Sequence, residues 1–373
     1  MRAREVVKKR YLEIRFLILK IAKAILPAAG KHQPPSKHKV FRVLFIRIDR
    51  IGDMVLSTPV FRLFKNYFPN SIVEVLASAA NKAILENNPY VDTTLVYPQS
   101  RDVLSRIIWI LKLRRKNYQM VFDLHADYTL FTAIVAFLVG KRQRVGFKYC
   151  GREIFINYTI DIPTEKDFIA MTASLLNELG VNEDEKQPDL YISPTEQSWA
   201  ETWLRAHFQE SKPMLGIHPG AYYETQKWPA RYHAELVQKL NEAGDFNLIL
   251  FGAASDISMV RRILDFCNSP IEVFISNDLR KFGALLARQN IFICNNSGPL
   301  HMASALGIKT ISFMGPTNAT LWTPRGASHT VLRRNELDCI GCNRGDCKIG
   351  THDCMRLITS DQVYRAIVSS QYE

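Results

Sequence analysis

Along most of this chain, short runs of apolar residues alternate with stretches in which apolar residues lie three and four apart. This alternation predicts a repeated strand–helix pattern. Short apolar runs recur at 40–48, 72–77, 94–97, 120–124 and 144–147. Between and after these runs, apolar residues lie three and four apart near 57–67, 79–87, 101–116, 128–139 and 166–180. Short strands alternating with amphipathic helices are typical of a parallel sheet that helices cover on both faces.

The same alternation starts again after a polar, acidic stretch at 181–193. Strands are expected at 214–218, 248–252, 273–275, 291–294 and 310–314, and helices near 195–208, 230–243, 256–267, 279–289, 299–306 and 361–370. A chain of 373 residues is long for one hydrophobic core. We therefore predict two α/β domains, at 40–190 and 191–373. Parallel sheets bind ligands at the carboxyl ends of their strands, so a site is expected in the cleft between the domains.

Residues 1–39 differ from the rest in charge and pattern. They hold eleven lysines and arginines against two glutamates, so nine of the twelve net positive charges lie there. The remaining body is nearly neutral, which argues against a nucleic-acid groove. Apolar residues in this segment share one helical face, and positions 31–39 read as a linker. The members of that face are Val7, Tyr11, Ile14, Ile18, Ile21 and Ile25.

This basic amphipathic helix has two interpretations. It suits an anionic membrane surface, or it packs on the body or frays as a tail. Its longest unbroken apolar run is Phe16 to Leu19, far short of the roughly 20 residues of a spanning helix. No small-residue cleavage site follows a clean apolar core, so a signal peptide is not expected.

Four of the seven cysteines gather late in the chain. Cys339, Cys342, Cys347 and Cys354 are spaced C-x2-C-x4-C-x6-C. Four thiolates at such separations can bind a structural zinc ion, but the spacing is not that of a common zinc ribbon. A zinc site and unliganded thiols both remain open. The other three cysteines lie in or beside apolar segments and are expected to be buried free thiols.

The strongest candidate for a binding site is the turn Asn295-Asn296-Ser297-Gly298-Pro299. It follows an apolar strand and opens a helix whose first turn carries His301. Free N–H groups and the positive end of the helix dipole would meet there, which suits a phosphate or diphosphate. The alternative is an ordinary strand–helix turn.

Other strand ends carry polar residues with similar alternatives. Asp53 follows Gly52 near the start of a helix, where a carboxylate can simply interact with the helix dipole. Lys227 can neutralise a diphosphate or lie solvated on the surface. Asp256 can accept hydrogen bonds from ribose hydroxyls or cap a helix. It is the placement of all of these residues at strand ends that favours a shared site.

The sequence lacks the usual motifs of several enzyme classes. The chain has no Asp-x-Asp pair of a metal-dependent sugar transferase and no G-x-S-x-G nucleophile turn. It also lacks a G-x-G-x-x-G dinucleotide fingerprint and a Walker motif.

Four blocks of the sequence stand out together: RIDRIGDMVLSTPVFRLFK (47–65), HPGAYYETQKWP (218–229), LFGAASD (250–256) and NNSGPLHMASALGIKTISFMGPT (295–317). These blocks resemble glycosyltransferase family nine, the bacterial lipopolysaccharide heptosyltransferases. They occur in the family's order, and the resemblance runs from about residue 40 to the end. It implies a GT-B fold, in which two Rossmann-like domains face each other across a cleft. It also implies an ADP-heptose donor and inversion at the anomeric carbon with no metal or other cofactor required.

The resemblance also implies roles for individual residues. Asp53, after Gly52, matches the catalytic aspartate, and Lys227 matches the diphosphate-binding lysine. Asp256 matches the ribose-binding acidic residue, and Ser297, Gly298 and His301 match the diphosphate turn. The family commonly has aspartate where this chain has Asn296, which keeps the hydrogen-bonding shape and loses the charge.

We therefore expect heptosyl transfer to a lipid-anchored core saccharide. The domain at 40–190 would take the acceptor, the domain at 191–373 the nucleotide sugar, and the basic segment would hold the enzyme at the inner membrane face in the cytoplasm. One alternative keeps the fold with another donor or acceptor. Another is a non-catalytic nucleotide-binding protein associated with the membrane.

Overall fold

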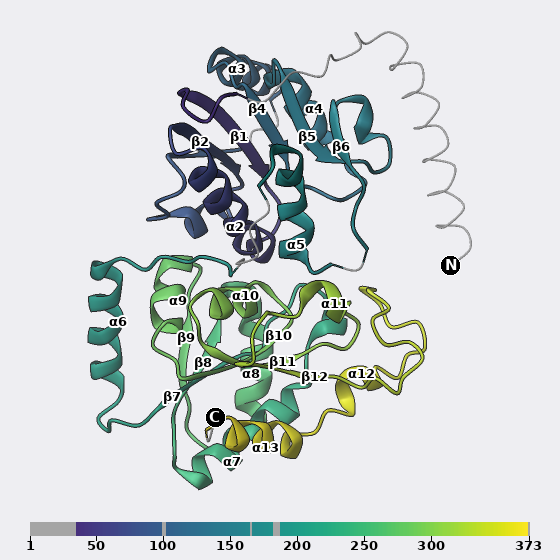
Figure 1. Cartoon of the computed structure of the whole chain (residues 1–373). Coiled ribbons are helices and arrows are strands. Elements are labelled where there is room, and N and C mark those ends of the chain that lie inside the picture. Colours follow the sequence, from purple (N-terminus) through teal and green to yellow (C-terminus); the bar gives the residue numbers. More distant parts are fainter. Residues whose placement is uncertain (1–34, 99–101, 165, 182–186, 372–373) are drawn as a thin grey trace. The chain divides into compact units, whose positions relative to one another are not determined.

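The computed structural model describes residues 35–98, 102–164, 166–181 and 187–371. The amphipathic helix expected within residues 1–39 lies largely outside these ranges. The chain divides into two compact units, each built on a six-stranded parallel sheet (Figure 1). Unit 1 comprises the described residues up to 49 together with 57–82 and 89–186, and unit 2 comprises 50–56, 83–88 and 187–373. Two successive α/β sheets are what the strand–helix alternation predicts.

The first sheet has the strand order β3-β2-β1-β4-β5-β6. Its strands are β1 (Phe41–Arg47), β2 (Ser71–Ala77), β3 (Thr93–Val96), β4 (Met120–Asp123), β5 (Gln143–Phe147) and β6 (Tyr158–Ile160). Its helices are α2 (Ile51–Tyr67), η1 (Lys82–Leu85), α3 (Val103–Arg115), α4 (Phe131–Val139), η2 (Arg152–Ile154), α5 (Phe168–Ala173) and η3 (Ser174–Leu179).

Alternating side chains of β1 build a separate core on each face of this sheet. Phe45 packs edge-on against Phe64 of α2 and stacks on Phe122 of β4, with 4.8 Å between the stacked ring centroids. Leu44 and Ile46 point the other way, into a cluster with residues of α3 and α4. The sheet is therefore covered by α2 on one face and by α3 and α4 on the other.

The second sheet repeats this topology in the order β12-β11-β10-β7-β8-β9. Its strands are β7 (Met214–His218), β8 (Asn247–Gly252), β9 (Glu272–Ile275), β10 (Ile291–Asn295), β11 (Lys309–Phe313) and β12 (His329–Leu332). Its helices are α6 (Pro194–His207), η4 (Glu224–Gln226), α7 (Ala230–Ala243), η5 (Ala254–Asp256), α8 (Ile257–Phe266), α9 (Leu279–Leu286), α10 (Gly298–Ala305), α11 (Ala319–Trp322), α12 (Asp353–Arg356) and α13 (Ser360–Gln371).

Both sheets contain a point where the chain reverses its direction of growth. Unit 1 adds β2 and β3 on one side of β1 and then β4 on the other, and unit 2 does the same around β7 with β10. At such a point the loops after the two central strands leave in opposite directions, which opens a crevice at the carboxyl ends of the strands. The sites of interest are therefore the ends of β1 and β4 and the ends of β7 and β10.

Some predicted elements were wrong in type or extent. The segment 79–87, expected to be a helix, forms only the short η1, because Asn81 is tied into tertiary hydrogen bonds with Ser78, Arg47 and Asp49. Helix α2 begins at Ile51, ahead of the expected residue 57, and runs through Pro59. The sequence pattern did not predict β6 and β12, which are short strands at the sheet edges.

Candidate functional site

The loop after β7 is fastened to the end of β10 by one fully buried amide, Asn295. Its Oδ1 accepts a hydrogen bond from the backbone N–H of Trp228 at 2.9 Å. Its Nδ2 donates to the carbonyl oxygens of Pro219 at 2.8 Å and Gly220 at 3.2 Å. Buried amides are stable when both ends are satisfied in this way. Asn295 therefore fixes the loop that carries Lys227 beside the turn that opens α10.

Helix α10 starts at that turn, with Ser297 as its N-cap and Pro299 in its first turn. The Ser297 side chain makes no capping bond to the helix, and its hydroxyl donates instead to the Asn295 carbonyl at 3.3 Å. The helix N-terminus keeps its positive dipole end and backbone N–H groups for another acceptor. The sequence predicts an anion site at this turn, at Ser297 and Gly298, and the site stays a prediction.

His301 lies in the same first turn and is buried. Burial, with a smaller effect of His329, lowers the pKa of His301 to about 4. The ring is therefore neutral at pH 7, and its Nδ1 has no hydrogen-bond partner among the described residues. A neutral imidazole contributes a directed hydrogen bond to an anion rather than a positive charge.

Lys227 supplies the positive charge on this side. Its side chain is only 14% exposed, so it is not the solvated surface lysine of the alternative interpretation. Its Nζ pairs with the carboxylate of Glu224, whose side chain is 75% exposed. An exposed partner contributes little binding energy, because water competes for it. A bound anion can therefore replace Glu224 at low cost.

Asp256 lies close to Lys227 and to the end of β7. Its Oδ2 accepts from the Ala253 backbone N–H at 3.0 Å and lies 3.6 Å from Nε2 of His218. Burial would raise the pKa of Asp256. The neighbouring His218, the Ala253 amide and Lys227 outweigh that effect, and the net pKa lies below its usual value. Asp256 is thus an ionised carboxylate that also organises its own turn.

Close packing at this carboxylate requires the glycine at 220. A Cβ built on Gly220 would lie 2.5 Å from Asp256 Oδ1 and 2.7 Å from the His218 ring. No real side chain tolerates such distances, so the loop after β7 can approach Asp256 only without one. Asn296, which was predicted to contact the donor, is buried next to Asn295 at the end of β10.

Asp53 occupies the first turn of α2, directly after Gly52. Its side chain is half-buried, and residues 50–56 group with unit 2. A carboxylate in the first turn of a helix is favoured by the helix dipole.

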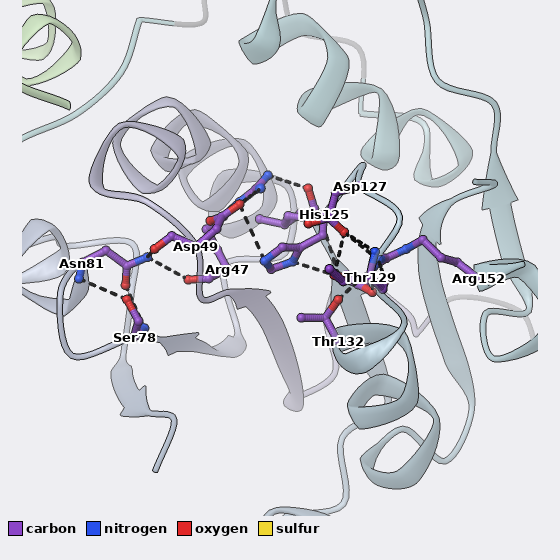
Figure 2. Close-up of polar contacts among 11 residues, drawn as sticks. Arg47, Asp49, Ser78, Asn81, His125, Asp127, Thr129, Thr132 and Arg152 are labelled. Carbon is purple, nitrogen blue, oxygen red and sulfur yellow. Dashed lines mark hydrogen bonds and ion pairs between the residues drawn. The ribbon is translucent and has the colours of Figure 1, made fainter. Parts of the chain in front are cut away.

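The ends of β1 and β4 in unit 1 carry a second set of polar residues that sequence reasoning did not select (Figure 2). Arg47, the last residue of β1, is buried, and its Nη1 donates to Asp49 Oδ2 at 3.0 Å. Asn81 donates to the carbonyl oxygens of Arg47 at 3.2 Å and Asp49 at 3.3 Å. The turn that leads from β1 to α2 is therefore held by both side-chain and backbone bonds.

Asp123, at the end of β4, connects the rest of this network. One carboxylate oxygen lies 3.1 Å from His125 Nδ1, and the other pairs with Arg152. Arg152 also donates to Thr132 Oγ1 at 2.9 Å and pairs with Asp127 at 3.4 Å. Burial would raise the pKa of Asp123, but Arg152 and His125 outweigh it and the net pKa is lowered. Asp123 is therefore a buried anion that depends on its partners.

The His125 ring lies between the two halves of the network, with Asn81 and Ser78 on one side and Arg152 on the other (Figure 2). Its Nε2 points towards Asp49, 3.7 Å from Oδ2, and has no hydrogen-bond partner among the described residues. Oδ1 of Asp49 is buried without a partner as well. The sequence signal that was available is DLHAD at 123–127, a polar run directly after a predicted strand.

The four clustered cysteines are all free thiols. Burial, with smaller effects of the neighbouring thiols of Cys339, Cys342 and Cys347, raises the pKa of Cys354 to about 11. In the described ranges, no group of three or more histidine, cysteine or acidic side chains is arranged to hold a metal ion. No helix in the described part of the chain is long and apolar enough to cross a membrane.

Comparison with known proteins gives one consistent result. The model of the family described as glycosyltransferase family 9 (heptosyltransferase) matches residues 109–352. Lipopolysaccharide heptosyltransferase 2 of Escherichia coli K12 is 25% identical over 340 residues, which cover 86% of this chain and 96% of that protein.

Solved structures show the same fold. The family 9 glycosyl transferase of Veillonella parvula has a TM-score of 0.78 at 20% identity, covering 89% of this chain and 97% of its own. The E. coli ADP-heptose lipopolysaccharide heptosyltransferase II has a TM-score of 0.72 at 22% identity, covering 89% and 98%. A more distant neighbour, the E. coli glycosyltransferase TibC, is described as iron-containing; its TM-score is 0.57 at 15% identity, covering 89% and 76%. The expected GT-B arrangement of two α/β sheets is confirmed.

Proposed function

The chain belongs to glycosyltransferase family 9, and from this premise we propose that it transfers heptose from ADP-heptose to a saccharide of the lipopolysaccharide core. As a member of this family it is a glycosyltransferase. The observation that carries the finer proposal is the geometry at the ends of β7, β8 and β10. There a nearly buried lysine, a helix N-terminus and an ionised aspartate come together in one unit.

These groups match two parts of a nucleotide-diphosphate sugar, the diphosphate and the ribose. We propose that the diphosphate lies against the N–H groups at Ser297 and Gly298 and against Lys227. Lys227 then breaks its ion pair with Glu224 and pairs with the diphosphate instead. His301 donates one hydrogen bond to a phosphate oxygen as a neutral ring. Asp256 accepts hydrogen bonds from the ribose hydroxyls. The name of the E. coli heptosyltransferase II structure includes ADP-heptose, which supports this donor.

Inverting transfer then needs two events at the anomeric carbon. Asp53 takes the proton of the acceptor hydroxyl as its oxygen attacks from the face opposite the diphosphate. Lys227 and the α10 N-terminus stabilise the charge on the departing ADP, which is the task a metal performs in other transferases. In this proposal no cofactor takes part, and Gly52 allows the backbone before Asp53 to approach the reacting groups.

We propose that unit 1 takes the acceptor. The polar network at the ends of β1 and β4 combines carboxylate, imidazole and guanidinium groups, which suit the hydroxyls and acidic groups of a core saccharide. The proposed division places the acceptor domain at 40–190 and the donor domain at 191–373. Nucleic acid is not a proposed partner, because the body outside residues 1–39 is nearly neutral.

If the acceptor is anchored in lipid, the enzyme must reach it at a membrane surface. We propose that the enzyme lies peripherally at the inner membrane face, helped by the basic segment 1–39. Removal of residues 1–38 is expected to weaken binding to anionic liposomes. Unchanged binding would exclude a role for the segment.

For the cysteine cluster we propose unliganded thiols, following their arrangement in the described structure. Metal analysis of purified protein is expected to find less than one zinc or iron per chain. A stoichiometric amount that disappears when Cys342 and Cys347 are replaced by serine would establish a structural metal instead.

A second candidate keeps the reaction and changes the donor. Asn296 favours it, because the family commonly has a charged aspartate at this position and an amide there alters what the turn can accept. One experiment separates the two candidates. The protein is titrated with ADP-, UDP- and GDP-linked sugars in the presence of EDTA, and release of the nucleotide is followed with a core-saccharide acceptor. The proposal expects turnover with ADP-heptose alone, and preference for another nucleotide would replace the donor.

A further inference from the structure

Helix α3 of unit 1 exposes an apolar face that nothing in the described residues covers. Val103 and Leu104 are 67% and 64% exposed, and Ile107, Ile108 and Leu111 are 47%, 45% and 50% exposed. Single exposed aliphatic residues are common on protein surfaces, but five on one helix are not. This set is called the α3 face below.

The spacing of these residues shows that they form one stripe. Positions i, i+1, i+4, i+5 and i+8 of a helix fall within less than half of its circumference. The opposite side of α3 holds the buried Leu113, with Trp109 and Ile110 against the core cluster under the sheet. The helix thus has two apolar sides, and only one of them is used by the fold.

Basic residues continue the α3 face at the C-terminal end of the helix. Arg114 and Arg115 continue the stripe by one more turn and are exposed, and Lys112 is exposed at its edge. No acidic residue occurs within α3. An apolar stripe that continues into arginines on one face is typical of helices that lie in the interface of an anionic bilayer.

One exposed aromatic residue lies on the helix beside α3. Helices α3 and α4 lie next to each other on the same side of the first sheet (Figure 1). Phe131, at the start of α4, is 39% exposed. Aromatic side chains at the edge of an apolar patch are favoured at the headgroup level of membranes.

We propose that the α3 face docks unit 1 onto an anionic lipid surface, with its aliphatic side chains among the upper acyl chains and its arginines at the headgroups. Charge argues against the two other occupants. A second copy of this face carries the same positive charge, and the segment 1–39 of the chain itself carries a net charge of +9. Anionic phospholipid matches both the apolar stripe and the arginines.

This docking deepens the proposed function, since an acceptor held in a membrane would meet the unit proposed to bind it. It rests on the proposed function only for that purpose. Lipid binding is measured without donor or acceptor, and transfer can be measured on a detergent-dispersed acceptor, so the failure of one proposal is distinct from the failure of the other.

The test uses the full chain and vesicles of phosphatidylcholine with or without phosphatidylglycerol. The variant Ile107→Ser, Ile108→Ser, Leu111→Ser is expected to lower the vesicle partition coefficient about tenfold on anionic vesicles. Its matched control, Leu264→Ser with Phe266→Ser, removes exposed apolar side chains from α8 and should leave binding unchanged. Arg114→Gln with Arg115→Gln should weaken binding to anionic vesicles only. Thermal unfolding by circular dichroism checks that each variant folds.

A photo-crosslinker in place of Ile108 identifies the occupant directly. With vesicles present, the proposal expects a phospholipid adduct in the mass spectrum. A crosslink within the chain to residues 1–34, a crosslinked pair of chains, or equal vesicle binding by the triple variant and the wild type would each overturn it.

Discussion

The two sheets share one strand order. They differ in the polar side chains at the point where the chain reverses its direction of growth, which is at the ends of β1 and β4 in unit 1 and of β7 and β10 in unit 2. At the ends of β1 and β4, opposite charges pair with one another, as Arg47 with Asp49 and Arg152 with Asp123. At the ends of β7 and β10, the polar groups are a buried amide, the neutral ring of His301, an uncapped helix N-terminus and the ionised Asp256. Lys227 is the cation there, and its partner is an exposed glutamate. The topology provides the crevice twice, and the side chains decide its chemistry.

This difference has an energetic meaning. A buried ion pair is held in place because either partner alone would be a buried, uncompensated charge. The unit 1 edge is therefore a rigid, charge-balanced surface. The unit 2 edge has a helix N-terminus without a side-chain cap and a cation that can exchange its partner, which suit an anion site.

The largest expected effect comes from opening the unit 1 network. Arg152→Ala leaves Asp123 buried without its cation and is expected to lower the free energy of unfolding by about 3–5 kcal/mol, measured by urea unfolding. Asp127→Asn is the control, because Asp127 is 46% exposed and its loss should cost less than about 1 kcal/mol. Equal losses in the two variants would contradict a closed network.

Asp53 tests whether the turn after β1 serves catalysis rather than stability. Asp53→Asn removes the proposed base and keeps the shape of the side chain. We expect kcat to fall about 10³-fold, within the usual range for general base catalysis, while ADP affinity stays within about twofold. Isothermal titration and a transfer assay measure the two quantities. A variant with wild-type kcat would remove Asp53 as the base.

Lys227 tests the exchangeable cation of unit 2. Lys227→Met is expected to lower kcat/KM about 100-fold and to weaken ADP binding, because it removes the positive charge that we propose faces the diphosphate. Glu224→Gln frees the lysine from its exposed partner and should bind ADP as well as or better than the wild type. Similar losses in both variants would mean that the pair acts as a structural salt bridge.

The smallest expected effect is the contribution of His233 to the pH dependence of stability. The ring is fully buried near Trp228 and Phe313, and burial, with a smaller effect of His218, lowers its pKa to about 3. As pH falls below 6.5 the unfolded chain takes up this proton and the folded chain does not, so stability falls. His233 should account for about 2 kcal/mol of the loss between pH 7 and pH 5. His233→Leu should remove this part in urea unfolding at the two pH values, and an unchanged loss would contradict it.

The sequence was sufficient for the repeated sheets and for placing several polar residues of unit 2 at neighbouring strand ends. Strand ends are visible as apolar runs that stop, and parallel topology brings those ends together. For this reason Lys227 and Asp256 could be predicted as neighbours although they are far apart in the chain, and the lowered pKa of Asp256 reflects that proximity.

What the sequence could not show are pairings that depend on three-dimensional register. Asp123 and Arg152 are 29 residues apart and look individually like ordinary surface charges, yet both are buried. Asn295 and Asn296 are adjacent and alike in chemistry. Only the structure shows that Asn295 ties the loop after β7 to β10.

The central claim is an inverting, metal-independent transfer of heptose, and the configuration of the product tests it most directly. The wild-type protein is incubated with ADP-heptose, a core-saccharide acceptor and EDTA, and the new glycosidic linkage is assigned by NMR. The account predicts a single heptosyl product whose anomeric configuration is opposite to that of the donor. A product with retained configuration, or transfer that appears only when a divalent cation is added back, would contradict it.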